Sequence, residues 1–456
     1  MNSNRVKMLI LLLVGAFISN VNAATLPKYG GVMRYAIFQN SITLDPIKIL
    51  TFTEYCISDS IFDGLVRCGQ NGSILPCLAS SWEISEDQKV YTFHIAESAE
   101  FHNGRKVTAS DVKFSWERSL KFADRSILEQ SKLRLISGAD SFRSEKANDV
   151  SGLKVLDENS IEVSLDQADS LFLESLTTPA GWIVPKESVQ KSDFSQHPVG
   201  SGPFKCGSST GAEGEILHLE AYGEYILGRP YLDGIVIIYA SDFETALLHF
   251  ETDELDCLEV PSIEFIKFKN DPEWSSQLSS IANNQLACLQ INKKSFPGKT
   301  KLVDVLKYGI DVKSILKMLY SQGSSVISDY QPEKARKLAV EFQGKPIKLT
   351  FLDSDYDAVK IADRITFDLM KIGVGVSVDP MNRQDFQQAL NGKSYYLALQ
   401  IIPLLPKDKN ILDTNIYVPL FYKNTNILQK PELQNLSNSE LNGVLQFDDM
   451  YLLHLK

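Results

Sequence analysis

The alternation of strand-like and helix-like patterns in the C-terminal third restricts the fold more than any other feature of this sequence. Apolar residues recur at every second position in the strand-like stretches and at every third or fourth position in the helix-like ones. Six such elements follow one another without a long break, and from the first strand onward they alternate strand-helix-strand-helix-strand. This order predicts a parallel or mixed α/β sheet with right-handed crossovers. The predicted elements are a helix at 332–342, a strand at 347–351, a helix at 358–372, a strand at 374–378, a short helix at 384–390 and a strand at 395–399.

The first 23 residues have the pattern of a secretory signal peptide. Arg5 and Lys7 form a positive start, residues 8–18 are apolar, and Val21-Asn22-Ala23 is typical of a cleavage site. The apolar run is too short to span a bilayer. The first cysteine is Cys56, far from this site, so we expect no lipid anchor. The sequence therefore predicts an exported, periplasmic protein that is cleaved near Ala23.

Charge and length narrow the class of protein further. Loss of the signal peptide removes two positive and no negative charges, so the net charge falls from −11 to −13. Such an acidic chain is not expected to bind nucleic acid or an anionic membrane surface. The remaining residues exceed what one core usually supports, which predicts two or three domains.

Six cysteines are compatible with an oxidising compartment, where disulfides form. Cys68 and Cys77 flank a turn-rich stretch between two short strands, and facing strands would bring them together. Cys257 and Cys288 are a second possible pair. The sequence does not choose among the fifteen pairings that six cysteines allow, and none of the cysteines has zinc-site spacing.

Sequence patterns of catalysis are absent. None of the six histidines belongs to an HExxH motif, and no phosphate-binding glycine loop occurs. The stretch Gly200-Ser201-Gly202 approaches a nucleophile elbow, but Pro203 follows and the motif is incomplete. The acidic pairs Asp253-Glu254 and Asp353/Asp355 are typical of solvated turns. We predict that the protein is not an enzyme and has no cofactor or metal, although sites assembled from distant residues stay open.

One long segment carries a family signature. It runs from Leu78-Ala79-Ser80-Ser81-Trp82 through Phe101-His102-Asn103-Gly104-Arg105 to Phe114-Ser115-Trp116-Glu117-Arg118. This segment closely resembles the family 5 solute-binding proteins, the peptide- and nickel-binding receptors of ABC importers. The resemblance extends over roughly residues 30–422. Its supporting motifs are residues 44–46, 61–65, 199–204, 228–233, 254–256, 291–292 and 308–311.

The resemblance implies a fold and a domain plan. The fold is α/β, of the type II periplasmic binding protein kind, with two lobes joined by a hinge and an extra α+β domain on the first lobe. Ligand then binds between the lobes, and closure around the hinge encloses it. The expected boundaries are 24–62 and 188–288 for the first lobe, 63–187 for the extra domain, 289–420 for a shortened second lobe and 421–456 for a return segment to the first lobe.

The resemblance also implies ligand contacts. In peptide-binding members an extended segment after the Leu-Asp-Pro motif pairs its backbone with the peptide, and the matching positions here are Leu50, Thr51 and Phe52. The family's aspartate for the peptide amine lies in a segment that this sequence lacks. Asp408 and Asp413 are the candidates to replace it. Without a replacement carboxylate, a free peptide amine would be poorly bound.

Two functions follow from these observations. The first is a monomeric receptor that passes a peptide or similar solute to the permease subunits of an ABC importer. The second is a family member without transport activity that acts as a periplasmic sensor or interaction component. Neighbouring permease genes would favour the first.

Overall fold

The structure is a computed structural model that describes residues 27–453 apart from a few segments. The predicted signal peptide lies outside the described residues. The gaps inside the range are 39–41, 70–72, 124, 209, 211–213, 293, 296–299, 320–323, 328, 343, 345, 404–415 and 437–446.

One sheet runs through both lobes, in the strand order β14-β13-β15-β12-β16-β11-β1-β10-β9-β8. Strands β11, β1 and β10 pair in parallel in the first lobe, and β14, β13 and β15 pair in parallel in the second. The predicted α/β class is therefore confirmed. The strands are β1 (Val32–Ile37), β8 (Phe204–Cys206), β9 (Glu215–Ala221), β10 (Gly234–Tyr239), β11 (Cys257–Val260), β12 (Leu278–Ile291), β13 (Ile347–Leu352), β14 (Val376–Met381), β15 (Leu397–Pro403) and β16 (Tyr417–Gln429).

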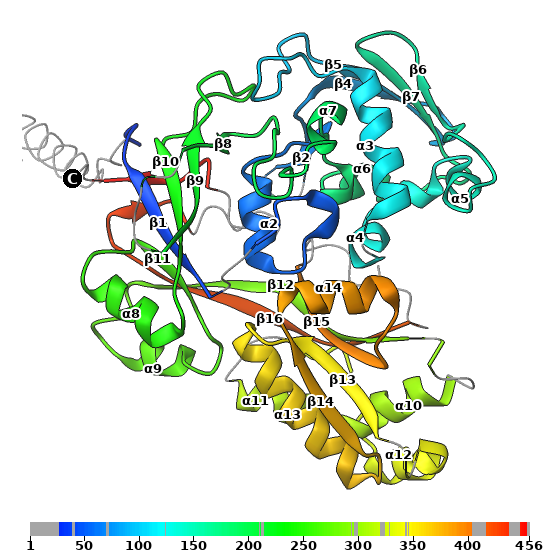
Figure 1. Cartoon of the computed structure of the whole chain (residues 1–456), viewed down its shortest axis with the longest axis vertical. Helices are drawn as coiled ribbons and strands as arrows, with labels where there is room; N and C mark the ends of the chain where they lie inside the picture. The colour runs from blue at the N-terminus through cyan, green and yellow to red at the C-terminus, as the bar shows by residue number, and fades with distance from the viewer. Residues whose placement is uncertain are drawn as a thin grey trace, which may run out of the picture.

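The long strands β12 and β16 connect the lobes. They pair antiparallel with each other, β16 continues onto β11 of the first lobe, and β12 continues onto β15 of the second. In Figure 1 both cross the middle of the molecule, with the extra domain, β1 and β10 above them, α8 and α9 to the left and the second lobe below. Two strands that cross between lobes form the kind of connection about which domains close.

Helices cover the sheet in each lobe. The helix from Tyr356 to Lys371 forms because apolar side chains recur along one of its faces and Asp355 caps its first turn. The helices are α2 (Phe52–Asp59), α8 (Phe243–Glu251) and α9 (Phe265–Asn270) in the first lobe, and α10 (Thr300–Gly309), α11 (Val312–Met318), α12 (Pro332–Leu338), α13 (Tyr356–Lys371) and α14 (Arg383–Gly392) in the second, with 3-10 turns at Pro46–Lys48 and Ala339–Phe342.

The extra domain is built on a separate sheet of order β4-β5-β7-β6. Its apolar side chains and those beneath β1 and β10 belong to one continuous core, whereas the second lobe has a core of its own. The first lobe and the extra domain therefore form one body. The elements here are β2 (Val66–Cys68), β3 (Ile74–Pro76), β4 (Ala79–Ile84), β5 (Val90–Ile95), β6 (Leu153–Val155), β7 (Ser160–Ser164), α3 (Ala109–Phe122), α4 (Arg125–Gln130), α5 (Ala139–Arg143), α6 (Phe172–Ser175) and α7 (Lys186–Val189), with 3-10 turns at Lys132–Leu135 and Pro179–Gly181; a short hairpin, β17 (Leu433–Gln434) with β18 (Tyr451–Leu452), lies near the C-terminus.

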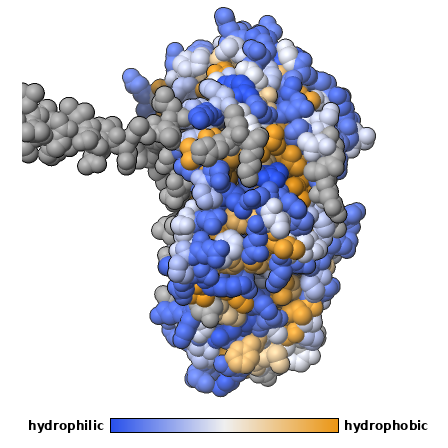
Figure 2. Space-filling model, turned by 90° about the vertical axis from the view of Figure 1, so that its left-hand side faces the viewer, coloured by the Kyte–Doolittle hydropathy of each residue, from blue (hydrophilic) through white to orange (hydrophobic). Residues whose placement is uncertain are grey.

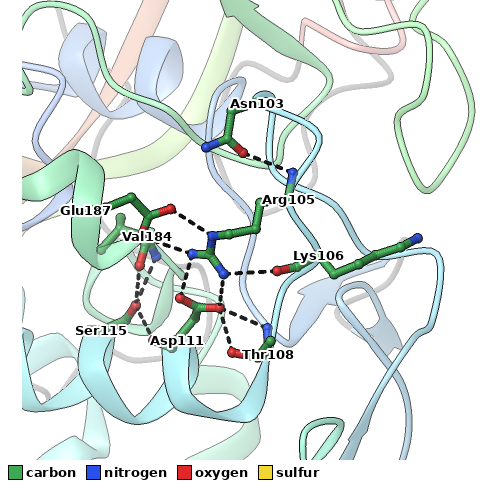
Figure 3. Close-up of polar contacts among 8 residues, drawn as sticks. All are labelled: Asn103, Arg105, Lys106, Thr108, Asp111, Ser115, Val184 and Glu187. Carbon is green, nitrogen blue, oxygen red and sulfur yellow. Dashed lines mark hydrogen bonds and ion pairs between the residues drawn. The ribbon is translucent and has the colours of Figure 1, made fainter.

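The signature segment builds the start of α3. The Arg105 guanidinium donates two bonds of 2.8 Å to the Asp111 carboxylate and one of 2.7 Å to Glu187, as Figure 3 shows. Asp111 also accepts from the backbone and hydroxyl of Thr108, which completes a capping box. The most recognisable stretch of the sequence thus makes internal bonds (the "α3 network": Arg105, Thr108, Asp111 and Glu187).

A second ion pair ties α3 to the first lobe. Arg118 donates to both oxygens of Asp45, at 2.8 and 2.7 Å, and Asp45 is buried. The turn at residues 199–204 packs against the 61–65 motif so closely that a Cβ at Gly200 would lie 2.0 Å from the Ile61 carbonyl oxygen. The incomplete nucleophile elbow is therefore a packing turn.

Neither of the two candidate cysteine pairs, Cys68 with Cys77 or Cys257 with Cys288, forms a disulfide. In the hairpin, Cys68 faces Ile74, while the backbone of Cys77 bonds to Leu65, so the two cysteines are not opposite each other. Cys257 and Cys288 lie on β11 and β12, which β16 separates.

The surface carries no long apolar face in the view of Figure 2. Hydrophilic residues cover most of the side that bears α8 and α9, and apolar residues lie between them in separate patches. Among the described residues, no helix is long and apolar enough to cross a bilayer.

Candidate functional site

Two adjoining hollows lie where the lobes face each other. Their cavity volumes are about 40 and 70 Å³ in this structure. Both are lined by Thr51 of the first lobe, Asp355 of the second and Ile401 of β15. Because they share residues from both lobes, they form one continuous cleft.

The "apolar hollow" lies between the segment before α2 and the face of α13. Its walls are mostly aliphatic and aromatic side chains from both lobes, with Gln130 and Gln400 among the few polar groups. Such walls fit an uncharged, apolar part of a ligand. Representative lining residues are Ile49, Leu50, Leu352, Ala358, Phe386 and Ile402.

The "polar hollow" holds three carboxylates and one ammonium group. Glu259 comes from β11, Asp355 and Asp357 from the start of α13, and Lys423 from β16, and all four line the same space. The Lys423 ammonium is 2.6 Å from Asp357, whose other donors are the backbone and hydroxyl of Ser262 at 3.1 and 2.7 Å. Asp357 thus has a full set of partners from two other elements.

The other two carboxylates have fewer partners. Asp355 accepts from the backbone of Ala358 as the helix cap. Among the residues that the structure describes, none donates a hydrogen bond to Glu259. Burial raises the pKa of Glu259 to about 7, against the lowering effect of Lys423, and burial likewise raises the pKa of Asp355. Burial alone would lower the pKa of Lys423, but Asp357, Asp355 and Glu259 together raise it.

An ion pair across the cleft holds the lobes together. Arg383, the first residue of α14, pairs with the fully buried Glu54 of α2 and donates to the Lys48 carbonyl at 3.0 Å. Glu54 also accepts from the backbones of Thr43 and Leu50. A third link joins the Tyr356 hydroxyl to the backbone of Phe243 at 2.9 Å. The described structure is therefore one in which the lobes touch.

A third, "basic hollow" opens between the extra domain and α14 and adjoins the apolar hollow at Gln400. Lys121, Arg134 and Lys393 line it. Their charge is partly offset at the surface, where Arg134 pairs with Asp140 at 3.1 Å and Lys121 lies 4.0 Å from Glu145. Exposed pairs of this kind contribute little binding energy.

The three residues predicted to contact a peptide backbone lie at the cleft. Leu50 and Thr51 line the apolar hollow, and Thr51 and Phe52 line the polar one. The segment is less open than predicted, because Leu50 donates its backbone to Glu54, Thr51 caps α2, and Phe52 is already helical. Their contact with ligand stays a prediction. Asp408 and Asp413 lie outside the described residues.

The sequence interpretation missed the carboxylates of the polar hollow. It assigned Asp353 and Asp355 to a solvated turn, which fits the exposed Asp353 but not Asp355. An aspartate immediately before a long amphipathic helix is a capping signal that could have placed Asp355 at a helix start. No local pattern indicates Glu259 or Lys423, which reach the site through strand pairing.

Comparison with known proteins gives the family. The model of the bacterial extracellular solute-binding proteins, family 5, matches residues 73–414. The chain belongs to this family. The heme-binding protein A of Haemophilus influenzae is 27% identical over an aligned length of 383, and the match covers 75% of this chain and 68% of that protein. The chain thus spans about two thirds of that relative.

Solved structures give the same fold for this family 5 protein. AgaA of A. tumefaciens R10, solved with agropinic acid, has a TM-score of 0.76 at 21% identity, over 93% of this chain and 99% of that one. DppA of Helicobacter pylori, solved with the peptide STSA, has a TM-score of 0.75 at 19% identity, over 94% and 99%. At these identities the likeness establishes the type II binding-protein fold, as predicted.

Proposed function

We propose that this protein is the extracytoplasmic receptor of an ABC importer and captures a peptide or similar small solute between its lobes. The observation that carries the proposal is the cleft itself, in which residues of both lobes line the same two hollows. A ligand there contacts both lobes only when they are closed, so it favours the closed state. The permease subunits then recognise that state.

Binding requires only that the solute fit the cleft. The apolar hollow excludes water from an aliphatic or aromatic group, and the polar hollow offers charged groups to the rest of the solute. Relatives in the family are named for heme, nickel and peptides. The family therefore leaves the solute open, while the walls of this cleft favour an organic molecule with an apolar part.

The test begins with the mature protein, residues 24–456. Native mass spectrometry identifies any co-purified ligand, and thermal shifts with peptide pools then measure binding. A ligand at about 100 times its Kd stabilises the folded state by about 2.7 kcal/mol. Small-angle scattering should show a more compact molecule with ligand than without it.

A matched pair of variants locates the site. Ala358→Phe fills the apolar hollow from α13 and should weaken binding at least tenfold, whereas Asp363→Phe puts the same ring on an exposed position of that helix and should leave binding unchanged. If no peptide, amine or metal pool shifts the melting curve, the receptor function is wrong. Uptake of the identified ligand should also stop when the gene is deleted.

A further inference from the structure

The polar hollow contains more negative than positive charge at a place that ligand reaches. Lys423 balances Asp357, which it contacts at 2.6 Å, and Glu259 and Asp355 remain. Both side chains are partly buried, so they keep some contact with solvent but have few donors, and a cation that reaches them stabilises their charge. Glu259 and Asp355 both line the polar hollow, so a ligand that enters the hollow can supply the positive charge that the protein lacks there.

The two carboxylates belong to different lobes. Glu259 lies on β11 of the first lobe, and Asp355 caps α13 of the second. A cation between them would be attracted to both only when the lobes are closed. The same group would therefore supply binding energy and favour closure.

Aromatic rings line the same space. Phe38 of the first lobe and Tyr356 of the second meet edge to face, with centroids 5.4 Å apart, and both border the polar hollow. The bond from Phe243 to the Tyr356 hydroxyl fixes that ring. Aromatic faces attract organic cations, which makes them suitable neighbours for an ammonium group.

The nature of the cation follows from its surroundings. The Lys423 ammonium lies beside the carboxylates and would repel a divalent ion, and among the described residues no group of three or more His, Cys, Asp or Glu is arranged to hold a metal. Asp355 also borders the apolar hollow. A group bound to Asp355 therefore has an apolar space immediately beside it.

We propose that Glu259 and Asp355 bind the ammonium group of an organic solute whose apolar part occupies the apolar hollow. This inference rests on the receptor function proposed above and names its ligand class. In this proposal the carboxylates that bind a ligand amine lie on β11 and at the start of α13. They take the role for which the sequence offered Asp408 and Asp413.

The experiment compares ligands that differ only in charge. The probes are a pool of leucine-rich tri- and tetrapeptides with free amines, the same pool N-acetylated, and leucinamide, which carries the amine without a peptide chain. Binding is measured by calorimetry at pH 8 for the wild type, Glu259→Gln and Asp355→Asn. Asn still caps a helix, so the second variant keeps α13 intact. Asp353→Asn, on the exposed position two residues earlier, is the matched control.

The expected result is that acetylation weakens wild-type binding at least tenfold. Each of the two variants should lose at least tenfold affinity for the free pool and little for the acetylated pool, while Asp353→Asn behaves as wild type. If leucinamide binds, the amine group itself is recognised without a peptide chain. If only the peptides bind, the recognised amine belongs to a peptide. Both results support the proposal. Equal binding of both pools, unchanged affinity in Glu259→Gln, or a tight native ligand without a cation would overturn it and leave the receptor function standing. No binding of any solute would remove both.

Discussion

The α3 network and the polar hollow both group charged side chains, but the partners of their carboxylates differ. In the α3 network, Asp111 accepts four bonds, two from Arg105 and two from Thr108. In the polar hollow, Glu259 receives none from the described residues, and burial raises its pKa to about 7. In the α3 network the charged groups bind one another. In the polar hollow, Glu259 faces the cleft without a hydrogen-bond donor from the described residues.

This difference separates structural from functional charge. A carboxylate with a complete set of donors stabilises the fold and has nothing left for a ligand. A carboxylate that is buried without donors destabilises the fold and gains when a cation arrives. The most recognisable motif of this chain belongs to the first kind, so family resemblance and ligand specificity come from different regions.

The largest effect is expected from breaking the α3 network. Asp111→Ala removes the main partner of Arg105 and the capping box of α3. The Asp111 carboxylate is buried while 36% of the Arg105 side chain is exposed, and the loss of the pair and the cap together should cost about 3 kcal/mol. Chemical denaturation should show this loss in the free energy of unfolding. Ligand affinity of the folded protein should not change, because the network lies in the extra domain. A selective loss of affinity without loss of stability would reverse the assignment of the two regions.

A smaller effect is expected at the ion pair across the cleft. Arg383→Met removes the cation that pairs with Glu54 in the closed state. In the open state water can reach Glu54, so the substitution should destabilise only the closed state. The closed state should lose about 2 kcal/mol, which weakens ligand binding roughly 30-fold. Calorimetry measures the affinity, and scattering should show a more open molecule. Arg383→Lys keeps a positive charge and should lose less; equal binding by all three proteins would show that the pair does not control closure.

Local patterns in the sequence predicted the scaffold well. The period of apolar residues in 347–399 gave the strands and helices of the second lobe, because each such element buries one face against the sheet. The candidate pair Cys68 and Cys77 does not form, because the hairpin register places Cys68 opposite Ile74.

The candidate site could not be predicted in the same way. Glu259, Asp355 and Lys423 are far apart in sequence and meet only because β16 pairs with β11 and α13 packs beside them. A carboxylate on a strand carries no local sign of whether a lysine on another strand neutralises it. The resemblance pointed to residues 50–52, which line the cleft, but none of its motifs includes Glu259, Asp355 or Lys423.

The polar hollow predicts a pH dependence that the α3 network lacks. Glu259 has a pKa of about 7 in the folded protein against an ordinary value near 4.5, so the folded state binds more protons between these values. The contribution of Glu259 therefore makes the ligand-free protein less stable as pH rises from about 5 to 8. Glu259→Gln removes this effect and should be more stable than the wild type at pH 8 by about 1–2 kcal/mol, allowing for the access of solvent to the hollow. Thermal unfolding of both proteins across this range measures the difference.

The same titration should appear in binding with the opposite sign. An ammonium group binds the ionised form of Glu259, so affinity should fall severalfold between pH 8 and pH 6, and Glu259→Gln should remove most of that dependence. The groups that face Glu259 are Lys423 on β16, Asp355 and Asp357 on α13, and Tyr35 on β1. Lysine and tyrosine do not titrate in this range. Asp355→Asn is the control for Asp355, the other carboxyl group whose pKa is raised. Identical curves for the wild type and Glu259→Gln would place the titrating group elsewhere.

The smallest effect is expected at the exposed edge of the α3 network. Glu187 bonds to Arg105 at 2.7 Å, but half of its side chain is exposed to solvent, and water can replace it as a partner. Glu187→Gln should therefore cost at most about 0.5 kcal/mol, and 0.5 M salt should reduce the difference further because it screens an exposed pair. Denaturation at low and high salt checks both statements. A loss as large as that of Asp111→Ala would show that Glu187 and Asp111 hold Arg105 jointly, and the network would then depend on its exposed member as much as on its buried one.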